Sequence, residues 1–287
     1  MARKPERDAV SGVVTTGHEW DGIKELDNPM PAWWIYTFYA CIAFALVWMV
    51  LYPSLPFVRG LLGYTARDTL SQVMQVQQAA AAPMLARIRA ASPAEIAADP
   101  ELRAYALAGG RIAFATNCAG CHGSGGQGAV GGFPSLADDD WIYGGSFDAI
   151  HTSISAGVRN GEHPEARGVA MPAFLSAGLN WAQINEVADH VLTLSAPAGA
   201  VPAEIPSAVL YAENCAACHG DRGEGNRDLG APRLNDRIWL YGGDKASIVR
   251  TIAYSRAGVM PAWAGRLDPA TINMLTVYVH ALGGGEQ

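Results

Sequence analysis

One long apolar stretch of the chain runs from Ala32 to Tyr52 and contains no charged residue. As a helix rising about 1.5 Å per residue, it would be about 31 Å long and would match a hydrocarbon core of about 30 Å. Aromatic residues gather at both of its ends, as they do at membrane interfaces: Trp33, Trp34, Tyr36, Trp48 and Tyr52. We therefore predict a transmembrane helix over residues 31–53, following a polar tail over residues 1–30.

Two other interpretations of this stretch are weaker. A cleaved signal peptide would start earlier and would carry a small-residue cleavage site before Pro53. A buried core helix would be shorter. Basic residues are more numerous before the stretch than after it, which predicts a cytoplasmic N-terminus. They are Arg3, Lys4, Arg7 and Lys24 before it, and Arg59 and Arg67 after it.

The segment from 54 to 103 is predicted to be a helical connector. It is rich in Ala and Gln, and its apolar positions are too sparse for a core of its own. We expect its helix to be broken near Pro83 and Pro93.

Beyond the connector the chain repeats the same order of features. The segment "FPSLADDDWIYGG" is followed later by "APRLNDRIWLYGG", and "VAMPAF" by "VMPAW". Each repeat closes with a helix that has a capping residue, Asn180 or Asp268. No stretch between residues 104 and 287 has the pattern of a strand ladder. We predict a mainly α protein with two small domains, 104–195 and 207–287, joined by a proline-containing linker over 196–206.

Each repeat contains one Cys-x-x-Cys-His motif, which is the signature of covalent haem c attachment. Two thiols at this spacing can bond to the two vinyl groups of a haem, and the next histidine can then bind its iron. The motifs hold four of the five cysteines: Cys118, Cys121, Cys215 and Cys218. The fifth, Cys41, lies in the apolar stretch and is interpreted as a small hydrophobic residue. The sequence thus predicts two haem c groups, with His122 and His219 as iron ligands.

Zinc and thiol redox chemistry are the alternatives for these motifs. Structural zinc needs four ligands close together, and the two cysteine pairs lie 97 residues apart. A thioredoxin-like dithiol would belong to a βαβ pattern, which is not present. The repetition of the motif within the same surroundings therefore favours haem.

The second axial ligand of each haem is predicted to be methionine. Met171 lies 53 residues after Cys118, and Met260 lies 45 residues after Cys215; each is followed by proline. Met274 is a competitor within a predicted helix. Bis-histidine ligation is the other alternative, with candidates at His151, His163, His190 and His280. Methionine ligation raises a haem's potential, suits electron transfer and leaves no open iron position for substrate.

The order of residues along the chain also suggests which residues hydrogen-bond to the ligating histidines and to the haem propionates. Pro134 and Pro232 are placed to accept a hydrogen bond from the histidine ring through their carbonyl groups. Five side chains are candidates for haem propionates, although the aromatic ones fit plain core positions equally well: Trp141, Tyr143, Trp239, Tyr241 and Arg233.

Taken together, the chain resembles the di-haem cytochrome c subunit, the FixP/CcoP type or subunit III, of cbb3-type cytochrome c oxidases. The resemblance is carried by "HEWDGIKELDNPMPAWWIYTFY", the single span ending in "LYPSLP", the "YALAGG" lead-in and the two motif repeats. It covers nearly the whole chain. It implies two tandem class I cytochrome c domains, with the eight residues Cys118, Cys121, His122, Met171, Cys215, Cys218, His219 and Met260 binding the haems.

The resemblance also implies a function. The subunit would take electrons from a soluble or anchored cytochrome c, or from the cytochrome bc complex. It would pass them through a mono-haem cytochrome subunit to the haem b and copper centres of the catalytic subunit, where oxygen is reduced to water and protons are pumped. The haem domains would be periplasmic, on a single-pass protein of the bacterial inner membrane.

Charge and the motifs narrow the remaining alternatives. The net charge is −7, and residues from Tyr105 onward carry 17 Asp and Glu against 11 Lys and Arg. This balance argues against nucleic acid and favours a basic cytochrome donor. An anchored di-haem shuttle serving a periplasmic dehydrogenase would have similar domains. A di-haem peroxidase or a gas sensor would need an open iron position, so we expect no catalytic site in this chain.

Overall fold

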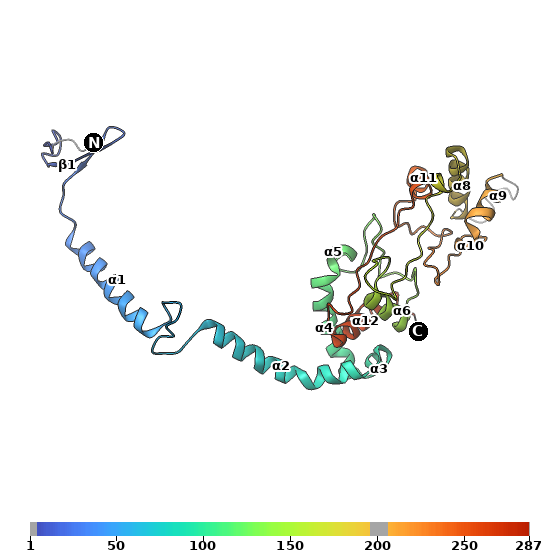
Figure 1. The fold of residues 1–287 in the computed structure, drawn as a ribbon, viewed down its shortest axis with the longest axis horizontal. Helices are drawn as coiled ribbons and strands as arrows, with labels where there is room; N and C mark the ends of the chain where they lie inside the picture. The colour runs from blue at the N-terminus through green and yellow to red at the C-terminus, as the bar shows by residue number, and fades with distance from the viewer. Residues whose placement is uncertain (1–4, 196–205, 287) are drawn as a thin grey trace. The chain divides into compact units, whose positions relative to one another are not determined.

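The computed structural model describes residues 5–195 and 206–286 and divides into two compact units, Met1–Ala80 and Ala81–Gln287. Figure 1 shows the order of the elements along the chain. Most of the linker predicted over 196–206 lies outside the described residues, as do Arg3 and Lys4. The prediction of a mainly α protein with one apolar N-terminal helix is confirmed.

The first unit begins with a β-hairpin that the sequence analysis did not anticipate. Strands β1 (Thr15–Trp20) and β2 (Ile23–Leu26) pair in antiparallel fashion, with Trp20 opposite Ile23. The two residues of the turn, Asp21 and Gly22, have φ angles of 48° and 87°. An Asp-Gly pair is the usual sequence for such a two-residue turn, so the signal was present in "WDGI".

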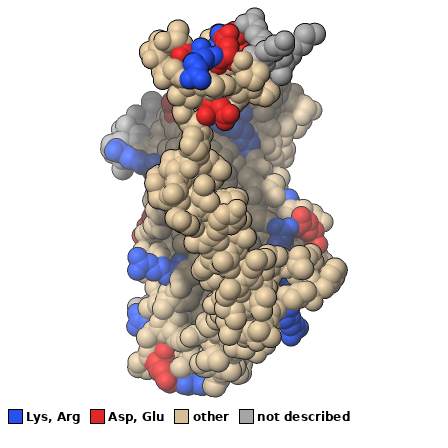
Figure 2. Space-filling view, turned by 90° about the vertical axis from the view of Figure 1, so that its left-hand side faces the viewer, with Lys and Arg blue, Asp and Glu red and all other residues tan. Residues whose placement is uncertain are grey.

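Helix α1 (Ala32–Leu51) follows the hairpin and has no buried residue. Among the described residues, it is the one helix long and apolar enough to cross a membrane. Figure 2 shows charged side chains gathered on the hairpin at the top and none on the tan helix below it. At the end of the helix the rings of Trp48 and Tyr52 stack with their centroids 4.2 Å apart. An apolar surface exposed on all sides is suited to lipid.

The connector forms helix α2 (Ala66–Ala90), and this helix continues through Pro83. The break predicted at Pro83 is therefore wrong. A proline removes one helical hydrogen bond, and the complete burial of Ile88 one turn later offsets that loss. The break before Pro93 is confirmed, because Ser92 forms a capping box that starts a separate helix α3 (Pro93–Ala98).

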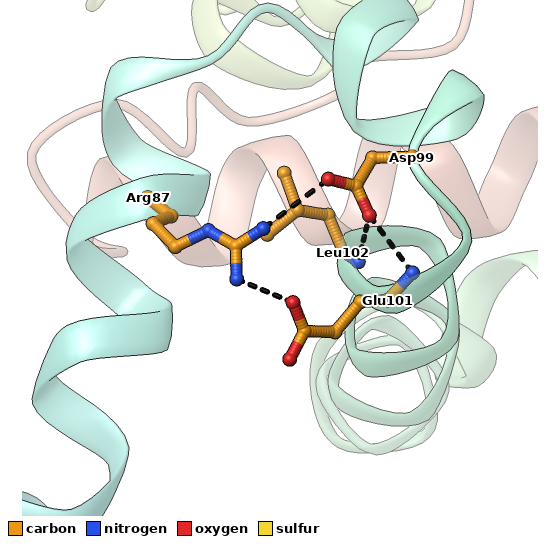
Figure 3. A network of polar contacts seen from close by, with 4 residues as sticks. All are labelled: Arg87, Asp99, Glu101 and Leu102. Carbon is orange, nitrogen blue, oxygen red and sulfur yellow. Dashed lines mark hydrogen bonds and ion pairs between the residues drawn. The ribbon is translucent and has the colours of Figure 1, made fainter.

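Figure 3 shows how the end of α2 is tied to the start of α4 (Pro100–Asn117). Arg87 contacts Asp99 at 3.2 Å and Glu101 at 2.5 Å. Asp99 also accepts hydrogen bonds from the backbone N–H groups of Glu101 and Leu102, so it caps α4. The side chains are partly exposed, so the ion pairs contribute modestly.

Two of the three hydrophobic clusters described in the second unit contain residues of α4, and we call them together the first core. It joins α4 and α6 (Phe147–Ala156) to the last helix, α12 (Pro269–His280). Phe114, Ile150 and Leu275 are each at most 3% exposed within it. Helices α4 and α12 approach closely because Gly110 has no side chain: a Cβ there would lie 2.4 Å from the Met274 carbonyl oxygen. The first core also buries Ile88 and Ile96 of the connector.

The second core joins α7 (Phe174–Ala177) and α8 (Trp181–Leu194) to α9 (Pro206–Asn214) and α11 (Lys245–Tyr254). Val187, Tyr211 and Ile252 are buried in it. The helix that closes each sequence repeat therefore packs on the helix that opens the other repeat. Figure 1 shows this pairing, with red α12 beside green α4 and α8 beside α9. The sequence analysis did not anticipate this exchange.

Candidate functional site

The two Cys-x-x-Cys-His motifs have the same local structure. Each begins where a helix ends, at Cys118 or Cys215, and continues as a single helical turn, α5 (Ala119–His122) or α10 (Ala216–His219). A glycine with φ near 80° follows each turn and lets the chain reverse. Cysteine and histidine side chains thus lie together on one short turn in both places.

Both histidine rings are oriented by a backbone carbonyl group. His122 Nδ1 lies 3.0 Å from the Pro134 oxygen, and His219 Nδ1 lies 2.9 Å from the Pro232 oxygen. Because a carbonyl oxygen can only accept, Nδ1 carries the proton and Nε2 keeps its lone pair. Burial lowers the pKa of both histidines, against the opposing effect of the carbonyl group. Both rings are therefore neutral at pH 7, as iron ligation requires.

The cysteines of both motifs are free thiols. Burial, with a smaller effect of the neighbouring thiol, raises the pKa of Cys118 and of Cys215 to about 11. A redox dithiol would need a lowered thiol pKa. The described part of the chain also holds no group of three or more His, Cys, Asp or Glu residues arranged for a metal ion. Neither zinc nor thiol redox chemistry is supported by this geometry.

One continuous, mostly apolar cavity connects the two motifs. Its lining includes both histidines, Cys118, Cys121, Cys215, Cys218, Met171 and Met260. All eight residues that the sequence analysis assigned to haem thus border the same cavity. The donor set consists of two oriented imidazoles, two thiol pairs and two thioethers, and it fits two covalently attached haem c groups.

Comparison with known proteins gives matches along the whole chain. Residues 12–59 match the N-terminal domain of cytochrome oxidase-cbb3, FixP; residues 106–195 match cytochrome c; and residues 206–279 match cytochrome c oxidase, cbb3-type, subunit III. The CcoP subunit of Azospirillum brasilense cbb3-type cytochrome c oxidase is 50% identical over 100% of both chains. The FixP subunit of Bradyrhizobium sp. (strain ORS 278) is 47% identical over 100% of both.

The chain belongs to the CcoP/FixP family of cbb3-type cytochrome c oxidase subunits. The family resemblance inferred from the sequence is confirmed. The presence of cytochrome c domains supports haem c binding and electron transport.

In this CcoP/FixP-family chain, each candidate methionine packs against the core that contains a cysteine of the other repeat. The order of the sequence had placed each methionine with the motif of its own repeat. Met260 packs against the first core together with Cys118, and Met171 packs against the second core, which contains Cys215. The competitor Met274 is part of the first core, with its sulfur against Gly109. Met274 is therefore a packing residue.

The histidines of the bis-histidine alternative do not line the cavity. His280 stacks on Phe147 at a centroid distance of 3.8 Å, and its Nε2 lies 2.9 Å from the Glu286 oxygen. His190 lies against the ring of Tyr211. These residues have structural contacts, and the geometry favours methionine.

Of the side chains suggested for haem propionates, two already have hydrogen-bond partners within the protein. The Trp141 ring N–H donates to the Gly284 carbonyl oxygen, so it already has a partner. Tyr143 accepts a hydrogen bond of 3.1 Å from Arg159. Trp239, Tyr241 and Arg233 line the cavity.

The sequence analysis missed a pair of arginines in equivalent positions of the two repeats. Arg167 and Arg256 each lie four residues before a candidate methionine, in "RGVAMP" and "RAGVMP". Each guanidinium lies over a tyrosine ring of its own repeat: Arg167 at 4.7 Å from the Tyr143 centroid, and Arg256 at 4.8 Å from Tyr241. The repeated spacing was the signal that could have identified them.

Arg159 and Arg256 line the cavity and donate hydrogen bonds to backbone carbonyl groups. Arg256 donates to the carbonyl oxygens of Tyr241 and Ser247, and Arg159 donates to that of Gly258. No ion pair joins either arginine to a carboxylate within the described ranges. Partly buried cations without a counter-charge are costly, so an anion is expected beside them.

Proposed function

We propose that the chain is the di-haem electron-relay subunit of a cbb3-type oxidase. It accepts electrons from a cytochrome c donor or a cytochrome bc complex and passes them towards the mono-haem cytochrome subunit and the catalytic haem b and copper subunit. The catalytic subunit then reduces oxygen to water with proton pumping. The observation that supports this most directly is the cavity lined by both Cys-x-x-Cys-His motifs and by both candidate methionines.

The chain's own residues hold and orient the two groups. Cys118 and Cys121 would bond one haem, and Cys215 and Cys218 the other. His122 and His219 would offer Nε2 to iron, because the proline carbonyl groups orient their rings. Met171 and Met260 would offer thioether sulfur atoms as the second ligands. When bound, haem c would supply one-electron chemistry.

The unpaired arginines are the proposed partners of the haem propionates. Arg159 and Arg256 border the cavity, and their positive charge offsets the carboxylates that a haem carries. A positive charge near iron disfavours the oxidised state and raises the potential. The continuity of the cavity supports a short path between the haems, and electron tunnelling weakens steeply with distance.

The proposed location is the bacterial inner membrane. Helix α1 crosses it once, with the hairpin in the cytoplasm and the haem domains in the periplasm. Its apolar exposed surface supports the crossing, and the basic residues before it support the orientation.

The test is a gentle detergent purification through a tag after Gln287. We expect haem b and copper to co-elute with two covalent haems per copy of the chain, together with cyanide-sensitive oxygen uptake. If haem c alone elutes with no oxygen uptake, the chain is an anchored shuttle, and the oxidase assignment is rejected.

A further inference from the structure

We propose that residues 53–64, which we call the return loop, form a lipid-binding segment that anchors the C-terminal end of α1 in the bilayer surface. The occupant of the loop's apolar surface is the region where lipid headgroups meet the acyl chains. The inference goes beyond the electron relay, and it rests on the proposed function only for the membrane crossing of α1. It gives this end of α1 a fixed depth, which an apolar helix alone does not have.

The return loop folds back onto the last turn of α1. The backbone N–H of Leu61 donates to the Val50 oxygen at 2.9 Å. The backbone N–H of Leu62 donates to the Leu51 oxygen at 3.1 Å. Figure 1 shows the chain turning back at the end of α1 before it enters α2. The last carbonyl groups of a helix have no donor within the helix, and an unpaired carbonyl group is costly in lipid. The loop therefore caps α1 in a way that suits the edge of a membrane.

The close approach of the loop to the helix depends on a glycine. Gly60 has a φ of 70°, and a Cβ at this position would lie 2.5 Å from the Leu51 oxygen. Beyond the glycine, the ring of Tyr64 meets the ring of Tyr52 edge to face, with the centroids 6.3 Å apart. The return loop is thus a defined structure at the end of α1, held by backbone and ring contacts.

This folded loop presents large apolar side chains on its surface. Phe57 is 98% exposed and Leu61 is 78% exposed, although the backbone around them is held in place. Three more apolar side chains of the loop are also exposed: Leu55, Val58 and Leu62. The loop has one charged residue, Arg59. Proteins rarely expose a contiguous apolar surface to water, so we infer that another phase or molecule covers it.

Lipid fits this surface for two reasons. First, the surface is continuous with α1, which has no buried residue and is long and apolar enough to cross a membrane. Second, its composition is that of a membrane interface. Aliphatic and aromatic side chains enter the boundary between headgroups and acyl chains by about 5–10 Å. The rings of Tyr52 and Tyr64 suit the headgroup level, and Arg59 extends its guanidinium towards phosphate while its stem stays in the apolar region.

The first test identifies what touches the loop in native membranes. The photoreactive amino acid p-benzoylphenylalanine takes the place of Phe57, and the membranes are illuminated before the protein is purified. We expect mass spectrometry to find phospholipid joined to position 57. The same amino acid in place of Gln78, an exposed polar residue of α2, is the control and should give no lipid adduct. Position 57 joined only to another protein subunit, or to nothing, would overturn the proposal.

The second test measures the depth of the loop in the full, haem-loaded chain in phosphatidylcholine vesicles. A nitroxide is attached at Ser54→Cys in a Cys41→Ser background, which leaves the apolar side chains of the loop in place. Oxygen concentrates in lipid and a nickel chelate stays in water, so collisions with each report depth. We expect Phe57→Ser combined with Leu61→Ser to move the label towards water, with fewer oxygen collisions and more nickel collisions.

Matched variants separate the loop from general effects. Val73→Ser with Val76→Ser removes two exposed apolar side chains from α2 and should leave the depth of the label unchanged. Gly60→Ala keeps every apolar side chain but blocks the fold-back, so it should move the label as the serine variant does. Gly63→Ala, at a φ of 59° with nothing within 4 Å of the added Cβ, should not. Equal shifts in the loop variants and their controls would overturn the proposal.

A nitroxide on the native Cys41 distinguishes failure of the anchor from failure of the membrane crossing. Cys41 lies in the middle of α1, so its label should collide mainly with oxygen if α1 spans the bilayer. If it does, and the loop variants leave the Ser54→Cys label in place, α1 crosses as proposed and the lipid anchor is rejected. If the label on Cys41 collides mainly with the nickel chelate, the crossing is rejected and the anchor with it.

Discussion

At the scale of single residues, the site depends on groups that orient others. His122 and His219 present Nε2 to the cavity only because Pro134 and Pro232 accept their Nδ1–H. Glycine has a similar role where two backbone segments meet, as at Gly157. These residues bind nothing themselves, yet they decide which atoms the cavity presents.

Replacing Gly157 with alanine should disturb one haem and spare the other. The added Cβ meets the Met260 oxygen, and the positive φ adds a cost of about 1–2 kcal/mol for any non-glycine residue. We expect the potential of the haem on His122 to fall in a spectroscopic redox titration, while the haem on His219 keeps its potential.

Gly161→Ala is the matched control for this variant. Gly161 has a similar φ of 66°, but a Cβ there meets nothing within 4 Å. It should lose similar stability and leave both potentials in place. Equal shifts in the two variants would show that strain alone is responsible.

Replacing Arg256 with glutamine should lower the potential of one haem, because it removes a positive charge that faces the cavity. The measurement is again a redox titration of the full chain. Arg250→Gln is the control: it removes the same charge from the exposed face of α11. If both variants shift the potential equally, general surface charge accounts for the effect and propionate pairing is rejected.

At the scale of elements, the contact between α4 and α12 organises the first core and also holds the connector. Asn273 of α12 is 8% exposed, and its side-chain amide donates to the carbonyl oxygens of Ile88 and Ala91 at 2.9 and 3.2 Å. These carbonyls belong to the end of α2, where a helix has no intrahelical donors left. The last helix of the chain therefore caps the connector.

Asn273→Ala should destabilise the second unit by about 1–3 kcal/mol, because two buried acceptors lose their donor. Thermal unfolding in detergent, followed by loss of helical circular dichroism, measures the change. Asn185→Ala, on the exposed side of α8, removes an amide bonded only to its own helix and should have a much smaller effect. Equal effects would contradict a capping role for Asn273.

At the scale of the whole molecule, the acidic balance of the haem-bearing part is the main guide to its donor. Residues from Tyr105 onward carry 17 acidic and 11 basic side chains, before any haem propionate is counted. This excess of negative charge attracts a positively charged partner over roughly 10 Å at 0.1 M salt.

Electron transfer from a basic cytochrome c should therefore slow as ionic strength rises. Stopped-flow reduction of the intact protein, at several salt concentrations and constant pH, measures this. An acidic cytochrome serves as the control and should show a flat or opposite dependence. A rate from the basic donor that does not change with salt would rule out electrostatic steering.

The sequence by itself determined the chemistry and the elements. A run of 21 uncharged residues, two Cys-x-x-Cys-His motifs and two Met-Pro pairs are local patterns. Such patterns predict a span, attachment sites and ligand types without reference to the rest of the chain. The Asp-Gly turn and the repeated arginines were equally local and could have been predicted. The break at Pro83 was wrongly inferred, because the burial of Ile88 further along the same helix outweighed a local preference.

Tertiary structure alone decided which parts of the two repeats pack together. Both repeats have similar opening and closing helices, so each closing helix has two suitable partners, and periodicity cannot distinguish them. The choice depends on contacts between residues far apart in sequence, such as Gly110 against Met274 and Val158 against Met260. The sequence of each repeat thus determined which segments form helices, and long-range packing determined which helix each of them contacts.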